Sequence, residues 1–450
     1  MLDAQRSRIA VVGTGVSGLS AAWLINQRHH VTVFEKESWI GGHCNTVDAP
    51  SATGHGARIP VDTGFIVYNE RTYPNLTALF DHLGVATEAS EMSFSASVDS
   101  GRFEYSGSSL VSMFAQKRNV LRPRFWRMIY DIVRFYGDAV DHSAHPENRD
   151  ATLGDYLDRH HYSETFLRDH LLPMGACIWS ATLRNMREYP LASFVRFFQN
   201  HGLLELRDSK RPQWRTVTGG SRAYVAKIAA GFAENIRRNC AVVSITRFPS
   251  HVEIKTADGS VEAFDGVVIA SHSDQALAML GDASTEERAT LGQIRYERNH
   301  AVLHRDESLM PRRRRAWASW NYIAAENLCD SRLVCLTYWM NSLQNIDHGD
   351  PLFVTLNPHR APRPDAFIDA FEYEHPIFDS AALQAQRRLH ELQGRNRTWF
   401  CGAYFGHGFH EDGLQAGLSV GEAVSGMRRP WTVADESGRI FLPQPLEAAA

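Results

Sequence analysis

The first regular pattern along the chain is a short apolar run followed by a glycine-rich turn. Residues 8–12 (Arg-Ile-Ala-Val-Val) contain β-branched residues and predict a buried strand. The turn Gly-Thr-Gly-Val-Ser-Gly occupies residues 13–18, and a helical pattern runs from about residue 17 to residue 27. A second predicted strand, at residues 30–35, ends in the carboxylate of Glu35. Strand, glycine turn, helix, strand and acid in this order predict a dinucleotide-binding unit.

Each glycine of this turn has its own expected role. Gly13 permits the tight turn, Gly15 lets a pyrophosphate approach the backbone, and Gly18 lets the helix pack closely on the strand. The amides at the helix N-terminus point at phosphate. Glu35 can accept hydrogen bonds from a ribose diol and would repel a 2′-phosphate, which disfavours NADP. The expected contacts of this unit are Gly13, Gly15, Val16, Ser17, Gly18, Glu35 and Lys36.

Two segments after this unit favour FAD over NAD. The pair Gly41 and Gly42 suits a backbone that passes beside a bulky ligand. Residues 61–65 (Val-Asp-Thr-Gly-Phe) place a small, flexible stretch where a flavin ring can lie. A simple loop explains residues 61–65 equally well when they are taken alone. The expected contacts here are Gly41, Gly42, His43, Asp62, Thr63 and Gly64.

A strand, a glycine-rich loop and a helix recur near the C-terminal end. Residues 398–402 predict the strand, and the helix extends to about Met427. If the N-terminus of that helix faces the flavin, its dipole stabilises the negative charge of the reduced ring. The expected contacts are Gly402, Ala403, Asp412, Gly413 and Leu414.

Together these segments resemble the flavin amine oxidase and phytoene desaturase superfamily, in which FAD lies extended across a discontinuous domain. The resemblance implies an α/β fold: a Rossmann-like FAD-binding domain of the amine oxidase/glutathione reductase type with a discontinuous mixed α+β substrate domain. The FAD-binding domain would comprise residues 1–85, 205–285 and 385–430, the substrate domain residues 86–204 and 286–384, and a C-terminal tail residues 431–450. Within the FAD-binding domain, strands are predicted at residues 241–245, 252–255, 261–264 and 266–270. By the same resemblance, the backbone near Val243 holds adenine.

More closely, the chain resembles a bacterial branch of predicted NAD/FAD-binding oxidoreductases through residues 173–180, 271–275, 319–322 and 408–413. Members of that branch are commonly associated with cyclopropane-fatty-acyl synthase-like methyltransferases. This implies a lipid or fatty-acyl substrate and a methyltransferase partner. Two positions depart from the superfamily pattern. His43 replaces a phosphate-binding arginine, and Ala403 replaces an acidic residue, so anchoring of the cofactor differs at both.

The densest polar group of the C-terminal loop comprises His407, His410, Glu411 and Asp412. A metal site is disfavoured, because these ligands would have to face one way beside a flavin. Our catalytic candidates are His410, Glu411 and Tyr404, with proton transfer or flavin tuning as the role of His410 and Glu411. Capping of the helix by Asp412 is the alternative. Residues 272 and 274 (His, Asp) can cap a helix as readily as react, and Tyr404 and Trp320 are candidates to line a substrate cavity, with core packing as the alternative.

The superfamily chemistry places a substrate C–H bond against flavin N5, to which a hydride moves. Our leading hypothesis is desaturation or oxidation of an unsaturated or methylated fatty acyl group. An amine oxidase and a non-catalytic FAD-binding partner of a lipid methyltransferase are the alternatives. No second G-x-G-x-x-G follows a predicted strand, which counts against a separate NADPH site.

Charge and composition bear on location and partners. The formal net charge of −4 gives no global attraction to nucleic acid. The six cysteines form no CxxC pair, and no signal peptide or transmembrane run is present, so we expect a cytoplasmic protein. Residues 112–134 mix basic and aromatic side chains, and residues 312–315 are four consecutive arginines. Both suit contact with the cytoplasmic face of a membrane, and a solvated helix face is the alternative because Pro123 interrupts a long helix.

Overall fold

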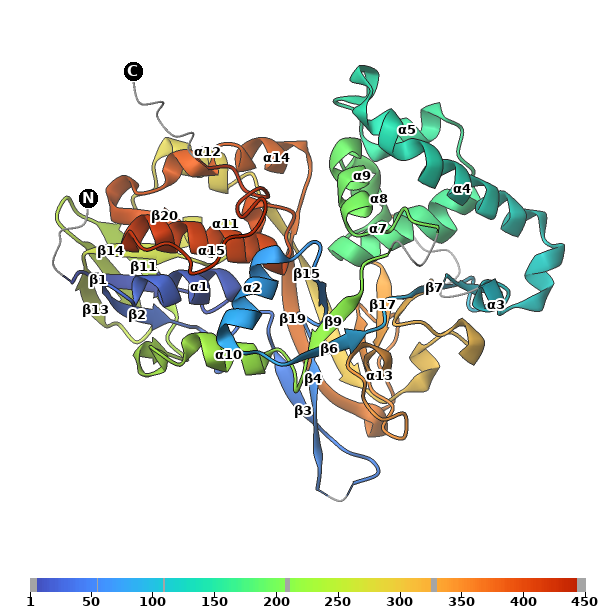
Figure 1. Cartoon of the computed structure of the whole chain (residues 1–450), viewed down its shortest axis with the longest axis horizontal. Helices are drawn as coiled ribbons and strands as arrows, with labels where there is room; N and C mark the ends of the chain where they lie inside the picture. The colour runs from blue at the N-terminus through green and yellow to red at the C-terminus, as the bar shows by residue number, and fades with distance from the viewer. Residues whose placement is uncertain (1–5, 55, 108–109, 207–210, 325–329, 443–450) are drawn as a thin grey trace.

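The computed structural model describes residues 6–54, 56–107, 110–206, 211–324 and 330–442. In Figure 1 a parallel sheet with its helices lies on the left, and a mixed sheet with a group of helices lies on the right. Two long strands, β15 (Arg295–His304) and β19 (Phe367–Ile377), run between these two parts. Each part has its own cluster of buried apolar side chains.

The parallel sheet has the strand order β10-β2-β1-β14-β20. Its strands are β1 (Arg8–Val12), β2 (His30–Phe34), β10 (Ile236–Arg237), β14 (Gly266–Ile269) and β20 (Thr398–Phe400). β1 lies in the centre because its apolar residues pair with β2 on one side and β14 on the other. The predicted Rossmann-like arrangement is therefore confirmed, and its strands come from three separate parts of the chain.

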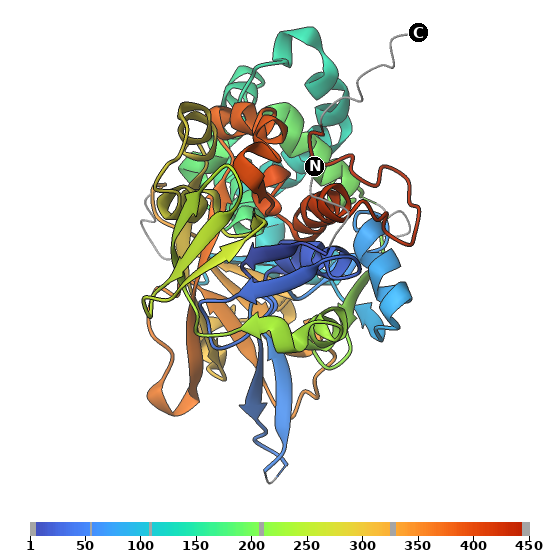
Figure 2. The ribbon, with the colours of Figure 1, turned by 90° about the vertical axis from the view of Figure 1, so that its left-hand side faces the viewer.

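Two helices from opposite ends of the chain pack against each other on this sheet: α1 (Val16–Ile25) and α15 (His410–Ser425) (Figures 1 and 2). Glycines on one side of α15 permit the close approach. A Cβ at Gly417 would lie 2.2 Å from the carbonyl oxygen of Ser17, and one at Gly413 would lie 2.9 Å from the Ser17 hydroxyl. Larger residues at these positions would push the two helices apart.

A second layer on the parallel sheet is a small antiparallel sheet, β11 (Val242–Arg247), β12 (Val252–Thr256) and β13 (Val261–Phe264). The bounds agree with the predicted strands to within two residues. The flanking helices are α2 (Pro74–Leu83), α10 (Arg222–Ala229), α11 (Ser273–Met279), α12 (Thr285–Leu291) and α14 (Ser380–Gln386).

The mixed sheet has seven strands in the order β19-β15-β18-β17-β16-β7-β8. Neighbours are antiparallel except β16 and β7, which are parallel. Besides β15 and β19, its strands are β7 (Phe94–Val98), β8 (Phe103–Ser106), β16 (Trp320–Ile323), β17 (Cys335–Trp339) and β18 (Phe353–Leu356). This sheet forms one wall of the cavity described below.

Helices on the right of Figure 1 cover one side of the mixed sheet. They are α3 (Leu110–Met113), α4 (Pro123–Ala144), α5 (Leu153–Arg159), α6 (Glu164–Phe166), α7 (Leu172–Trp179), α8 (Leu183–Glu188) and α9 (Leu191–Asn200). Pro123 stands in the first turn of α4, where a missing amide costs no hydrogen bond, so it begins the helix rather than interrupting it. None of the helices in the described ranges is long and apolar enough to cross a membrane.

The two parts are joined by short strands. β3 (Thr46–Pro50) and β4 (Arg58–Asp62) form a hairpin that projects downward in Figure 2, and β5 (Tyr68–Asn69), β9 (Trp214–Val217) and β6 (Thr87–Ser90) form a small sheet. β6 and β9 come from segments that the sequence assigned to different domains. The predicted domain boundaries stay a prediction.

Candidate cofactor and substrate site

One large cavity of about 1690 Å³ connects the carboxyl ends of the parallel strands with the space between the mixed sheet and the helices. Small-molecule pockets usually measure roughly 300–1000 Å³. The cavity begins at the glycine turn after β1 and reaches Met113 of α3 and Tyr136 of α4. Its size therefore allows a dinucleotide and a further ligand to lie end to end.

At the glycine turn the backbone forms an open cradle. Apart from Gly15 itself and its two chain neighbours, no atom of the described residues lies within 4 Å of where a Cβ of Gly15 would stand, and Gly15 lines the cavity. A Cβ at Gly42 would lie 3.1 Å from the Cα of Gly15, and Gly42 has φ +58°. Glycine at both positions keeps two backbone segments close together beside open space, as a pyrophosphate requires.

Glu35 ends β2 beside this cradle and lines the cavity. Its carboxylate accepts hydrogen bonds from the backbone N–H of Thr14 at 3.0 Å and from that of Glu37 at 2.9 Å, and it is also bonded to the Thr14 hydroxyl. These bonds fix the carboxylate where a ribose diol would approach.

Most of the predicted cofactor contacts share this cavity. Those that line it are Gly13, Gly15, Val16, Ser17, Glu35, Lys36, Gly41, Gly42, His43, Thr63, Gly64, Val243, Gly402 and Ala403. The remaining predicted contacts, Gly18, Asp62, Asp412, Gly413 and Leu414, do not line it. Their contacts within the protein show what each does in the fold.

The glycines outside the lining serve packing. A Cβ at Gly18 would lie 2.0 Å from the carbonyl oxygen of Gly13, so only glycine lets α1 pack on the end of β1. Gly413 faces Val16 and Ser17 of α1, and Leu414 lies in the apolar core.

The two aspartates outside the lining are also bound within the protein. Asp412 is buried and accepts a hydrogen bond of 2.8 Å from the Phe409 amide, which caps α15. The fully buried Asp62 accepts hydrogen bonds from the Ser221 amide and hydroxyl, from Thr46 and from Gln344. Burial raises the pKa of Asp62 to about 6, against the effect of these bonds. It joins β4, β3 and the start of α10.

His43 lines the cavity with an imidazole that burial keeps neutral. Burial, followed by the nearby His375, lowers the pKa of His43 well below its ordinary value. In the described part of the chain its Nε2 has no hydrogen-bond partner. An orphaned buried nitrogen in the lining can bond the cofactor, but it supplies no positive charge in place of an arginine. With the open cradle at Gly15, this fits FAD.

His410 begins α15 and belongs to a buried hydrogen-bonded group with Tyr224 and Cys44. Its Nε2 lies 2.5 Å from the Tyr224 hydroxyl, which lies 2.9 Å from the Cys44 sulfur. The His410 ring stacks on Phe65 at 3.8 Å between centroids. Burial lowers the pKa of His410 to about 3 and raises that of the Cys44 thiol, so both groups are neutral near pH 7. His410 lines the cavity, so it can form a hydrogen bond with a ligand. Because it is neutral, it cannot form an ion pair with one.

Glu411, the second catalytic candidate, does not line the cavity. Its carboxylate points to the first turn of α2, where it accepts hydrogen bonds from the amides of Asn75 at 3.1 Å and Leu76 at 3.0 Å. The Asn75 and Gln415 side chains donate two more. Glu411 therefore caps the N-terminus of α2 and joins α2 to α15.

Tyr404 lines the cavity, as the sequence predicts. Its hydroxyl is buried and has no hydrogen-bond partner among the described residues. Burial raises its pKa well above the ordinary value, so the hydroxyl stays protonated. It can donate a hydrogen bond to a ligand, but it cannot act as a base near pH 7.

His272 and Trp320 also line the cavity, whereas Asp274 is exposed and accepts a hydrogen bond from the amide of Gln275. Sequence reasoning missed Tyr373 and His375, which alternate on β19 beside His43, with 5.0 Å between the rings of His43 and Tyr373 and 5.2 Å between those of His43 and His375. The period-two spacing of these rings in a strand was the available signal.

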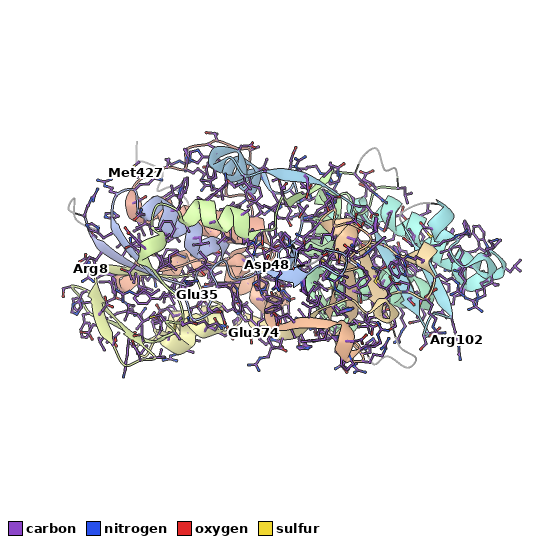
Figure 3. The ribbon with its side chains drawn as sticks, turned by 90° about the horizontal axis from the view of Figure 1, so that it is seen from below. Arg8, Glu35, Asp48, Arg102, Glu374 and Met427 are labelled. Atoms are coloured by element: carbon purple, nitrogen blue, oxygen red, sulfur yellow. The ribbon has the colours of Figure 1, made fainter. Side chains whose placement is uncertain are left out.

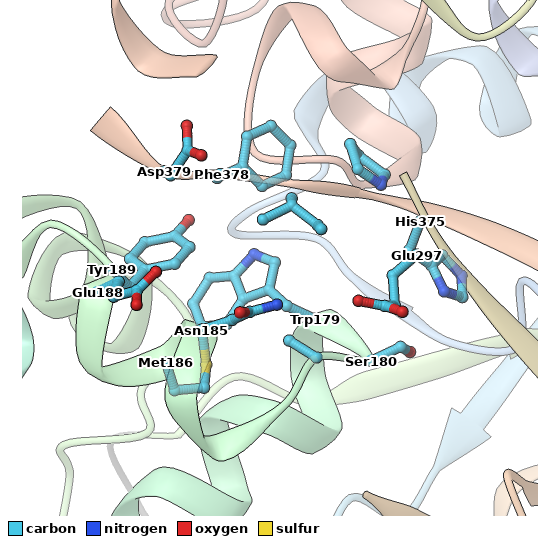
Figure 4. A pocket seen from close by; sticks show the side chains of 13 residues that line it. Trp179, Ser180, Asn185, Met186, Glu188, Tyr189, Glu297, His375, Phe378 and Asp379 are labelled. Atoms are coloured by element: carbon cyan, nitrogen blue, oxygen red, sulfur yellow. The ribbon is translucent and has the colours of Figure 1, made fainter. Parts of the chain in front are cut away.

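Beyond this polar region the cavity wall becomes apolar. It is formed by Met92, Phe94, Met174, Ile178, Tyr338 and Leu356. Trp179 belongs to this wall and separates it from a small pocket of about 20 Å³ on its other side (Figure 4). In that view the Trp179 ring lies between Phe378 and Met186. We call the part of the cavity inside this apolar wall the apolar extension. An elongated apolar group fits there.

A parallel Rossmann-type sheet with an open pyrophosphate cradle and an adjoining apolar cavity defines an FAD-dependent oxidoreductase. The flavin containing amine oxidoreductase family matches residues 16–297, more than half of the chain. The chain therefore belongs to this family, and its cofactor is FAD.

No curated protein matches the sequence. Among solved structures, the CLA-producing fatty acid isomerase from P. acnes is 16% identical with a TM-score of 0.63, and the match covers 93% of this chain and 98% of that chain. Cyclohexylamine oxidase from Brevibacterium oxydans IH-35A is 18% identical with a TM-score of 0.66, covering 94% and 99%. Putrescine oxidase bound to putrescine is 15% identical with a TM-score of 0.61, covering 94% and 99%. These likenesses show a shared fold.

Proposed function

We propose that the protein oxidises or desaturates a fatty acyl chain that lies in the apolar extension of the cavity. The observation that carries this proposal is the length and lining of the cavity, which continues from the polar region near His410 to Met113 and Tyr136. A short amine would leave most of that apolar surface without a ligand. The fatty acid isomerase among the structural neighbours supports the proposal at the level of fold.

The residues that line the cavity position the substrate and exclude water. When bound, FAD accepts a hydride from a substrate C–H bond. Phe94, Met174 and Ile178 hold an acyl chain by apolar contact, and Trp179 closes one side of the cavity. His43 and His410 are neutral and Tyr404 is protonated, so each offers a hydrogen bond in a dry site without a competing charge.

The first experiment mixes FAD-loaded protein anaerobically with unsaturated and methyl-branched fatty acids and with a panel of amines. We expect the fatty acids to bleach the flavin absorbance and the amines to leave it unchanged. The variant Met174→Trp fills the apolar extension, and we expect it to keep FAD but to lose bleaching by fatty acids. Ile129→Trp is the matched control, because Ile129 is half-buried on α4 but does not line the cavity.

Two other outcomes would replace this proposal. Bleaching by amines alone would make the protein an amine oxidase. No bleaching by any compound would favour a non-catalytic FAD-binding partner of a methyltransferase. The association with a methyltransferase stays a prediction, and a comparison of membrane fatty acids in cells with and without this protein, both carrying the methyltransferase, tests it.

A further inference from the structure

An apolar stripe on α4 faces solvent instead of the core. Trp126, Tyr130 and Val133 follow one another at helical spacing, with 49%, 57% and 50% of their surface exposed. Leu121, just before the helix, is 86% exposed. Monomeric proteins rarely expose several large apolar side chains side by side. We call these residues, with Val120, the α4 stripe.

The structure brings the two basic segments of the sequence together next to the stripe. The Arg118 and Arg122 side chains both donate to the carbonyl oxygen of Arg102, at 2.6 and 2.9 Å. Arg313 donates to the carbonyl oxygen of Gly101, one residue away, at 3.1 Å. Residues far apart in the chain therefore form one basic patch. Figure 3 places Arg102 at the opposite end of the molecule from Arg8 and Met427.

Positive charge is crowded on this patch. Burial, followed by the charges of Arg118, Arg124 and Arg313, lowers the pKa of Arg122. Glu104 is fully buried and bound to Arg313 at 2.7 Å, and Asp99, with 40% of its side chain exposed, lies 3.4 Å from Arg124. The exposed basic residues of the patch are Arg102, Lys117, Arg118 and Arg312. Such a surface attracts an anionic partner.

The stripe also adjoins the end of the large cavity. Ile132 and Tyr136 line the cavity from the side of α4 next to the stripe, and Met113 lines it from α3. Leu206 lines the cavity as well and is 57% exposed, so the cavity reaches the molecular surface there. Ile132, Tyr136 and Met113 therefore place one end of the cavity beside the α4 stripe.

We propose that the α4 stripe and the basic patch dock the protein on a membrane that contains anionic lipid. Exposed tryptophan, tyrosine and leucine side chains insert at the boundary between headgroups and acyl chains, and arginine and lysine beside them bind lipid phosphate. A nucleic acid would use the charge but not the aliphatic residues Leu121 and Val133. Docking does not depend on the substrate, whereas entry of an acyl chain from the bilayer rests on the proposed function.

The test is flotation of the FAD-loaded protein with vesicles of phosphatidylcholine, with and without phosphatidylglycerol. We expect binding to the anionic vesicles, release by high salt, and little binding to phosphatidylcholine alone. Lys117→Glu combined with Arg118→Glu should weaken binding by at least about tenfold. Leu121→Ser should also weaken it. Arg395→Glu and Phe367→Ser are matched controls, because both residues are exposed outside the α4 stripe and the basic patch.

A second measurement locates the contact. Brominated lipids should quench part of the tryptophan fluorescence in the native protein, and less of it in Trp126→Phe. Equal binding of the control and patch variants would overturn the proposal, as would binding of single-stranded nucleic acid without any binding of vesicles. Vesicle binding without bleaching by fatty acids overturns the proposed function alone, and bleaching without vesicle binding overturns the docking face alone.

Discussion

Gly15 and Gly18 stand three residues apart in one turn, yet the space around them differs. The position of a Cβ on Gly15 opens into the cavity, and that of a Cβ on Gly18 collides with the backbone of Gly13. The first glycine therefore leaves room for a ligand, while the second lets a helix meet a strand. The spacing of the motif is the same for both roles, and only the fold separates them.

This difference predicts opposite results for substitutions at the two glycines. Gly15→Leu should keep the fold, because its side chain projects into open space, but it should lose FAD because that space is where the pyrophosphate passes. Gly18→Leu should lose stability directly. The measurements are FAD released on denaturation and the far-ultraviolet circular dichroism of the purified variants.

Gly281→Leu is the control, since that position is also open but lies outside the cavity lining. It should retain both cofactor and fold. A normal FAD content in Gly15→Leu would show that the pyrophosphate passes elsewhere.

Among the helices, α2 and α15 are joined through Glu411. Glu411→Ala leaves the buried amides of Asn75 and Leu76 without an acceptor, so it should lower the free energy of unfolding by roughly 2–4 kcal/mol. If Glu411 is a cap, the surviving folded protein should bleach at the native rate with substrate. Chemical unfolding and anaerobic stopped-flow absorbance measure the two effects.

Glu422→Ala near the other end of α15 is a useful comparison, because Glu422 also accepts partly buried hydrogen bonds, from the Arg429 amide and guanidinium. It should lower stability without changing the bleaching rate. A Glu411→Gln variant that is stable but fails to bleach would restore Glu411 as a catalytic residue.

The sequence predicted the elements whose signals are local. The β1–α1–β2 unit follows from a β-branched run, a glycine turn and an acid, and the C-terminal strand and helix follow from the same kinds of pattern. The long strands β15 and β19 were not predicted, because their polar and apolar residues show no regular alternation of buried and exposed positions.

The site was predictable only in part for the same reason. Cofactor residues lie in glycine-rich turns, which have recognisable spacing. The group of His410, Tyr224 and Cys44 joins residues whose positions differ by 180 or more, and no spacing rule connects them. Asp412 and Glu411 are residue types that often act in catalysis. In the fold both are buried, and they cap helices: Asp412 caps α15 and Glu411 caps α2.

For the whole molecule, buried histidines set the response to acid. Burial lowers the pKa of His170, His201 and His410 to about 3 and that of His304 and His375 to about 4, whereas unfolded histidine titrates near 6.5. The unfolded chain therefore binds protons that the folded chain does not. Stability is fully present above pH 6.5 and falls as the pH drops toward 4, by about 1.4 kcal/mol per pH unit for each such histidine.

Three buried carboxyls with raised pKa values, Asp62, Asp169 and Glu411, act in the opposite direction and reduce the net effect. We still expect the melting temperature to fall between pH 6.5 and pH 5, because the histidines are more numerous. His304→Gln should make the dependence shallower by about one proton. A melting temperature that rises on acidification would contradict this expectation.

The position of β1 between β2 and β14, with α1 covered by α15, has a consequence for biosynthesis. The chain emerges from the ribosome N-terminus first, so β1 can pair early with β2, but its other neighbour β14 begins at residue 266 and α15, which covers α1, ends at residue 425. Until then the apolar side chains of α1 that pack on α15 stay uncovered, and we expect the nascent chain to bind chaperones. Because residues 402–404 and 407–410 line the cavity, we expect FAD to bind only after this part of the chain has been made, and we expect such long-range closure to be slow.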